Sequence, residues 1–155
     1  MMKTFRTADR EGREMRGCIF CRIIRREAPA HIVYEDEHTL AFLDINPCSP
    51  GHTLIIPKLH AQRLEELPED EAIALFRTLH RLIEPIRRAV GADSTTIGIN
   101  NGPESGQEVP HVHIHVIPRF RGDGGGIIQG VARLWRRPTR GEMERIARRI
   151  RNLAE

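Results

Sequence analysis

The longest regular pattern of apolar positions along the chain predicts one long helix over residues 68–91. Apolar residues recur there at steps of three and four, which places them on one helical face: Ala72, Phe76, Leu79, Ile83, Ile86 and Val90. Pro68 and the three carboxylates behind it are typical of a helix start, and Gly91 is typical of a stop. Pro85 removes one backbone hydrogen bond, so we expect it to bend the helix.

Shorter apolar or alternating segments predict β-strands on both sides of this helix. Before it, residues 31–34 and 39–44 flank an acidic turn and predict a hairpin, and residues 53–56 predict a third strand. After it, residues 95–100 and 111–117 predict two more strands. Neighbouring strands joined by short turns favour an antiparallel sheet.

Two short helices are predicted near the ends of the chain. Residues 20–24 keep helical spacing and should stop before Pro29. Thr139 and Glu142 have the spacing of a capping box, and the helix that follows carries Met143, Ile146, Ile150 and Leu153. The chain is therefore expected to fold as an α+β domain, with a sheet of about five strands, one long helix and short terminal helices.

The length of 155 residues suits one domain with its own core. Residues 1–17 are polar, without the apolar middle of a signal peptide, and predict a flexible N-terminal arm before a domain over 18–155. No apolar run approaches the length of a membrane span. We therefore expect a cytoplasmic protein without a membrane partner.

Arginines provide almost all of the positive charge and concentrate at the two ends of the chain. The formal net charge is +3, and Lys3 and Lys58 are the only lysines. Clustered arginines can contact nucleic-acid phosphates. In the last helix they alternate with Glu142 and Glu144, which favours a solvated helix face. Nucleic acid is therefore not expected as a partner.

The segment 111–117, His-Val-His-Ile-His-Val-Ile, carries the most chemistry in the chain. In a strand, its alternation places His111, His113 and His115 on one face and the apolar residues on the other. The apolar face should anchor the strand in the core. Imidazole acts as nucleophile, proton donor or metal ligand, so the polar face predicts the wall of an active site. The alternative is a histidine-rich face that only contacts solvent.

Two kinds of chemistry are open to these imidazoles. One is a catalytic zinc, but side chains at i and i+4 of a strand lie about 13 Å apart, so at most two neighbouring histidines can share one ion. In the other, the central ring is a nucleophile, a neighbour is its proton donor and phosphorus is the electrophile. The loop over residues 100–107 favours the second, because its glycines and N–H groups can cradle a phosphate.

The histidine strand, with Asn100 and Gly106-Gln107 before it, resembles the signature of the histidine triad (HIT) family of nucleotide hydrolases and transferases. The resemblance extends through residues 18–24, 33–36, 41–45 and 51–58. Within the family, the short bacterial Hit/Hint-like proteins are most similar. The loop Gly102-Pro103-Glu104 also resembles the branch that hydrolyses diadenosine polyphosphates. The resemblance implies the HIT-like fold.

The resemblance also implies a role for each matching position. His113 attacks the α-phosphorus and carries a transient nucleotidyl group, and His115 donates a hydrogen bond to the phosphate or the leaving group. The phosphate is held by the catalytic-site residue His52, by Asn100 and by the Gly106 backbone, and Gln107 is a further substrate-binding residue. The ribose is bound by Asp44, and the base pocket is lined by Phe20, Ile23, Ile45 and Leu54, although each apolar residue can equally be core. Glu108 stands where family members often carry Ser or Thr, and we expect its carboxylate to turn away from a phosphate.

Cys18 and Cys21 form half of a structural zinc site, which has four tetrahedral thiolate or imidazole ligands. Some family members complete this pair with two histidines, which correspond here to His60 and His111. The resemblance therefore implies a structural zinc, with two core-facing cysteines as the alternative. Cys48 is expected to be a buried thiol outside any site.

Together these inferences predict a purine nucleoside phosphoramidase-like nucleotide hydrolase that cleaves adenylated substrates and releases AMP. The long helix and the neighbouring strand edge, with the resemblance, predict a homodimer. A dinucleoside polyphosphate hydrolase is the alternative within the same chemistry. A nucleotide-binding regulatory protein whose arginines contact nucleic acid is the alternative of another class.

Overall fold

The computed structural model describes residues 17–132 and 137–154 of the chain. The described residues form two compact units, one ending at Gly125 and the other beginning at Gly126. The N-terminal arm predicted over residues 1–17 lies almost entirely outside the described residues, and the domain bounds 18 and 155 stay a prediction. None of the described helices combines the length and the apolar character needed to cross a bilayer.

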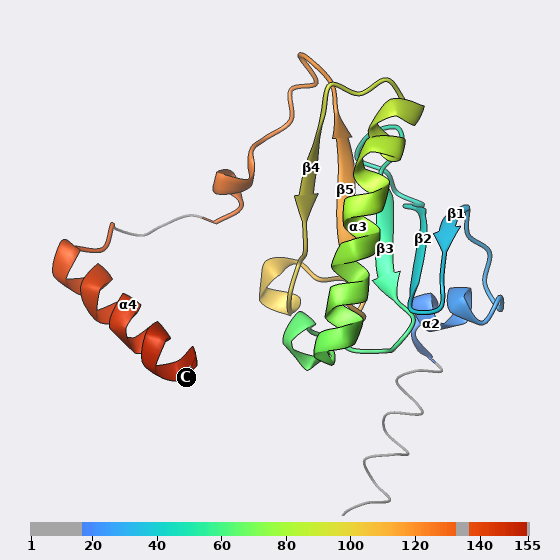
Figure 1. Cartoon of the computed structure of the whole chain (residues 1–155). Helices are drawn as coiled ribbons and strands as arrows, with labels where there is room; N and C mark the ends of the chain where they lie inside the picture. The colour runs from blue at the N-terminus through green and yellow to red at the C-terminus, as the bar shows by residue number, and fades with distance from the viewer. Residues whose placement is uncertain (1–16, 133–136, 155) are drawn as a thin grey trace, which may run out of the picture. The chain divides into compact units, whose positions relative to one another are not determined.

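A five-stranded antiparallel sheet is the centre of the first unit (Figure 1). Its strands are β1 (Ile32–Glu35), β2 (Thr39–Leu43), β3 (Thr53–Pro57), β4 (Ser94–Gly98) and β5 (Ile114–Arg119), in the order β1-β2-β3-β5-β4. Strand β5 therefore lies inside the sheet, where His115 pairs with Leu54 on one side and Gly98 on the other. The predicted α+β class with an antiparallel sheet is confirmed.

The two faces of the sheet are covered by different helices. The long helix α3 (Glu69–Ala89) packs on one face, where alternate strand residues such as Ala41, Ile55, Ile114 and Val116 join its core. The short helix α2 (Ile19–Ile24) contributes to the core on the other face, with Leu40, Phe42, Leu54 and Ile56. Because side chains alternate along a strand, the three triad histidines face the opposite side from Ile114 and Val116, which is the α2 side.

Helix α3 buries a face that overlaps only in part with the one that the apolar pattern indicated. Of the predicted residues, Leu79 and Ile86 are buried, and Ala72 and Ile83 pack against the core. Phe76 belongs to that pattern but is 44% exposed, whereas Leu75 and Leu82 are buried. The buried face is lined by Ala74, Leu75, Thr78, Leu79, Leu82 and Ile86. Thr78 can be buried on this face because its hydroxyl has a hydrogen-bond partner, the hydroxyl of Thr39 on β2 at 2.8 Å. This contact involves a distant strand, so the helix pattern alone did not predict the orientation.

The second unit contains the 3₁₀ turn η3 (Ile128–Gly130) and the helix α4 (Arg140–Ala154). The capping box is confirmed, since the Thr139 N–H donates to Glu142 Oε2 at 2.8 Å and the Glu142 N–H donates to Thr139 Oγ1 at 3.3 Å. All four predicted apolar residues of α4 are exposed by more than half. No residue of α4 is buried, so its arginines also lie on a solvated surface.

Candidate functional site

The three triad histidines lie together, although the regular strand begins later than predicted. Strand β5 starts at Ile114, because the Val112 N–H donates to the Ala61 carbonyl at 2.8 Å and not to a neighbouring strand. The backbone stays extended enough to keep the rings on one face. The ring centroids of His113 and His115 lie 4.9 Å apart, and Phe20 packs edge-on against His113 at 5.2 Å.

His113 is held in one orientation and one tautomer by the backbone of His111. Its Nδ1 lies 2.7 Å from the His111 carbonyl oxygen, which can only accept a hydrogen bond. Nδ1 therefore carries the proton, and Nε2 carries the lone pair. Within the described residues Nε2 has no hydrogen-bond partner, and the ring is only 5% exposed. This is the arrangement of a fixed neutral imidazole that presents a nucleophilic nitrogen.

His52 and His115 form a second directed pair. The Cys48 backbone N–H donates to His52 Nδ1 at 3.1 Å, so His52 carries its proton on Nε2. His52 Nε2 lies 2.9 Å from His115 Nδ1 and donates to it. The remaining proton of His115 is then on Nε2, which is buried and has no partner among the described residues. An unpaired buried donor is costly, and this one indicates a ligand position beside His113.

The pKa values favour neutral imidazoles at this site. Burial, followed by the neighbouring His113 and His52, lowers the pKa of His115 to about 4. Burial also lowers the pKa of His52, although the carboxylate of Asp44 opposes that shift. At pH 7 His115 is therefore neutral, and it carries its single ring proton on Nε2 as a hydrogen-bond donor.

The other predicted contacts of the nucleotide lie in contrasting surroundings. Asp44 accepts a hydrogen bond from the Asn46 N–H at 2.9 Å, and its other oxygen is 3.6 Å from His52 Nε2. The residues predicted to line a base pocket divide into two groups. Ile45 is 91% exposed, whereas the core on the α2 side includes Phe20, Ile23 and Leu54.

The predicted metal ligands Cys18, Cys21, His60 and His111 come together from three separate segments, with their ligand atoms within 4.8 Å of one another. His111 Nδ1 lies 3.1 Å from His60 Nδ1, 3.5 Å from Cys18 Sγ and 3.6 Å from Cys21 Sγ. Cys21 Sγ is 3.3 Å from His60 Nδ1. Around one tetrahedral zinc, ligand atoms at about 2.0 Å for nitrogen and 2.3 Å for sulfur are separated by roughly 3.3 to 3.8 Å. The separations given above are near this range, so the donor set and its spacing suit a single ion.

The surroundings of this cluster also suit a metal. His111 is fully buried, and its Nε2 donates to the Pro57 carbonyl at 2.8 Å, which leaves the lone pair of Nδ1 directed at the cysteines. Burial, with the neighbouring Cys18 thiol, raises the pKa of Cys21 to about 12. A thiolate forms at such a position only if a cation compensates its charge. Asp44, His52 and His115 form a second possible group of ligands, but their contacts are explained by the hydrogen bonds given above.

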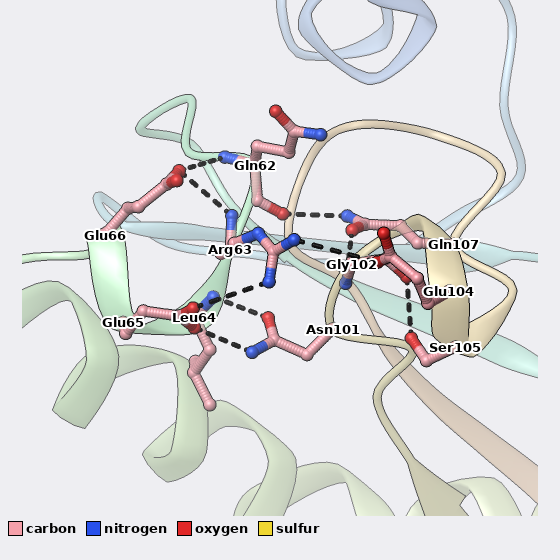
Figure 2. A network of polar contacts seen from close by, with 10 residues as sticks. All are labelled: Gln62, Arg63, Leu64, Glu65, Glu66, Asn101, Gly102, Glu104, Ser105 and Gln107. Carbon is pink, nitrogen blue, oxygen red and sulfur yellow. Dashed lines mark hydrogen bonds and ion pairs between the residues drawn. The ribbon is translucent and has the colours of Figure 1, made fainter.

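The loop before the triad uses its polar groups in an unexpected way. Asn101, next to the predicted phosphate ligand Asn100, has both amide atoms bonded to the turn η1 (Leu64–Glu66), and both amide atoms of Gln107 bond to backbone groups (Figure 2). The Gly106 N–H also donates within the loop, to the Pro103 carbonyl at 3.0 Å. The Asn100 side chain has no such partner among the described residues.

Two features of the site were not predicted. Cys48 is exposed, so the expectation of a buried thiol is wrong. Cys48 belongs to the loop after β2, and its backbone N–H fixes the tautomer of His52. The turn η1 and the hydrogen bonds that join Asn101 to it were not predicted either. Their partners lie more than 30 positions apart in the sequence, so no local pattern could indicate them.

Sequence comparisons agree with this geometry. The family model of the HIT domain matches residues 25–122. A HIT-like protein of Methanocaldococcus jannaschii is 52% identical over 107 residues, 69% of this chain and 82% of that protein. Adenylylsulfatase HINT3 of Arabidopsis thaliana is 46% identical over 68% of this chain and 54% of its own length. Adenosine 5'-monophosphoramidase HNT1 of Saccharomyces cerevisiae is 40% identical over 73% of this chain and 68% of its own.

Solved structures share the fold. The protein SMU.412c of Streptococcus mutans superposes with a TM-score of 0.81 at 35% identity, over 90% of this chain and 86% of that one. A zinc-bound histidine triad family protein of Mycobacterium smegmatis gives a TM-score of 0.67 at 35% identity, over 91% and 99%. The matching domain model, the identity to HIT-like proteins and the shared fold agree: this chain belongs to the HIT family.

Proposed function

We propose that the protein is a nucleotide hydrolase that cleaves adenylated substrates at the α-phosphate and releases AMP, in the manner of a nucleoside phosphoramidase. One observation carries the proposal: the lone pair of His113 Nε2 lies beside the unpaired Nε2–H of His115. A nucleophile next to a neutral donor suits attack on a phosphorus that carries negative oxygens. The activities in the names of HINT3 and HNT1 support the same class of reaction.

The reaction has two displacements at one phosphorus atom. His113 Nε2 forms a bond to the α-phosphorus, and the electron pair of the broken bond leaves with the amine or other leaving group, which takes a proton from solvent. The nucleotidylated ring is positively charged, and the His111 carbonyl at Nδ1 stabilises that charge. The His115 Nε2–H donates to a phosphate oxygen, and the hydrogen bond from His52 holds the His115 ring in place. Water then bonds to phosphorus, loses a proton to solvent, and returns the lone pair to His113.

The turnover of a substrate panel tests this function. Adenylated amines, dinucleoside polyphosphates and nucleotide sugars are compared, and adenylated amines should give the highest kcat/KM. Rapid quenching and mass spectrometry should trap an acid-labile adenylyl group on the peptide that contains His113. Replacement of His113 by alanine should abolish turnover and leave AMP binding nearly intact, because the ring supplies covalent chemistry more than affinity. Full activity of this variant would refute the nucleophile assignment.

We also propose that Cys18, Cys21, His60 and His111 hold one structural zinc. With four protein ligands, the ion would have no open position for water, so it would stabilise the fold and take no part in the displacement. The ligand distances and the buried Nδ1 lone pair of His111 support this assignment. The zinc-bound relative of Mycobacterium smegmatis supports it independently.

A homodimer is the oligomeric state that we propose. On α3, Phe76 is 44% exposed and Ile73 is 51% exposed. Within the described residues, β4 pairs only with β5, so its other edge is open. An open strand edge and exposed apolar side chains each favour association with a second copy.

A further inference from the structure

The loop before the triad is tied to the turn that follows the cluster residue His60 (Figure 2). We name the contacts between the two segments the loop clasp. The turn side of the loop clasp consists of Gln62, Arg63, Leu64 and Glu65, and the loop side consists of Asn101, Gly102, Glu104 and Gln107.

Two amide side chains form the centre of the loop clasp. Asn101 Oδ1 accepts from the Leu64 N–H at 2.8 Å, and Asn101 Nδ2 donates to Glu65 Oε2 at 2.7 Å. Gln107 Nε2 donates to the Gln62 carbonyl at 2.8 Å, and Gln107 Oε1 accepts from the Gly102 N–H at 2.8 Å. Each amide is thus bonded to the protein through both its nitrogen and its oxygen, which fixes the orientation of the side chain and joins the loop to the turn.

The remaining contacts restrict the backbone at Gly102 and in the turn. Gly102 is buried with φ of 108°, and a side chain there would meet the Arg63 guanidinium at 3.0 Å. The turn is itself fixed, because the Glu66 carboxylate accepts from the N–H groups of Gln62 and Arg63 at 3.0 and 3.1 Å. Just before the turn, the Ala61 carbonyl accepts the Val112 N–H, so the turn is bonded to the segment that carries His113.

We propose that Asn101 and Gln107 are positioning residues, which hold the loop in register with His113 and do not contact the substrate themselves. The neighbouring Asn100, whose amide has no protein partner among the described residues, is the one that faces the phosphate. The proposal rests on the proposed function, because it takes this loop to receive the phosphate of the nucleotide. It assigns substrate binding to Asn100 and loop geometry to the adjacent Asn101.

An exchange of donor and acceptor tests the role of Asn101. Asn101→Asp keeps the acceptor for the Leu64 N–H but places a carboxylate against Glu65, and it should lower kcat/KM by about tenfold. Adding Glu65→Gln should return kcat/KM to within about twofold of wild type, because the amide introduced at position 65 can donate to the carboxylate introduced at position 101. A residue that touched the phosphate would show no such rescue, since its new charge would still repel the nucleotide.

Matched controls separate the possible outcomes. Asn100→Asp should lower kcat/KM and the affinity for AMP, measured by calorimetry, and Glu65→Gln should not restore them. In free protein, Gln107→Ala should accelerate hydrogen exchange of the Gly102 amide by about tenfold or more, because its acceptor is lost. A double variant as impaired as Asn101→Asp, or unchanged exchange at Gly102, would overturn the positioning role. The exchange needs no turnover, so a wild type without hydrolase activity would refute the proposed function alone.

Discussion

The neutral state of His115 predicts how the free energy of unfolding depends on pH. Its pKa in the folded protein is about 4, below the ordinary value of 6.5, because burial and the neighbouring histidines disfavour the charged ring. Between those two values the unfolded chain binds more protons than the folded one. The contribution of His115 to the free energy of unfolding is therefore lost as the pH falls from about 6.5 to about 4.

The size of this effect follows from the shift in pKa. A displacement from 6.5 to about 4 corresponds to about 3 kcal/mol in full, and the partial access of water to the ring reduces the expectation to about 2 kcal/mol. We choose His115→Gln for the test, because its amide can still accept from His52 but does not titrate. The variant should lose about 2 kcal/mol less stability than wild type between pH 7 and pH 4.

Urea unfolding at closely spaced pH values measures the difference, with both proteins at the same zinc concentration so that the metal cluster affects them equally. His38→Gln is the control, because the expected effect of His38 on the pH dependence of stability has the opposite sign. The carboxylate of Glu71 raises the pKa of His38, so its stabilising contribution is present at low pH and is lost as the pH rises through that pKa. Parallel stability curves for wild type and His115→Gln would refute the view that His115 is held neutral by burial.

Three further predictions follow from the cluster, the dimer and the loop. Cys21→Ser should lose bound zinc by elemental analysis and more than about 3 kcal/mol of stability, and a variant that retained both would contradict the structural assignment. Wild-type protein should scatter light as a dimer at micromolar concentration, while Phe76→Glu should be monomeric because a charge is then placed in an apolar contact; a monomeric wild type would remove the proposal. Gly102→Ala should cost about 1 to 3 kcal/mol in thermal or urea unfolding, since alanine disfavours a φ of 108° and its Cβ displaces Arg63; an unchanged stability would show that the loop relaxes freely.

The local pattern of the sequence was sufficient to predict most of the elements. Alternation of His111, His113 and His115 with apolar residues predicted one polar and one buried face, because side chains in an extended chain alternate whatever surrounds them. Similarly, the Thr139 and Glu142 pair specified a helix start through bonds that span only three residues. The resemblance to the HIT family added the four predicted zinc ligands, and the structure brings all four together.

Only the tertiary structure decided which hydrogen-bond partners and tautomers these groups have. Asn100 and Asn101 are identical in chemistry, but the turn at Leu64 and Glu65 bonds only the second of them. The tautomer of His115 depends on His52, 63 positions away, and that of His52 on the backbone of an exposed loop at Cys48. Hydrogen bonds between distant segments form only when the sheet has assembled, and these bonds determine which nitrogen carries the proton and which side chain remains free for a ligand.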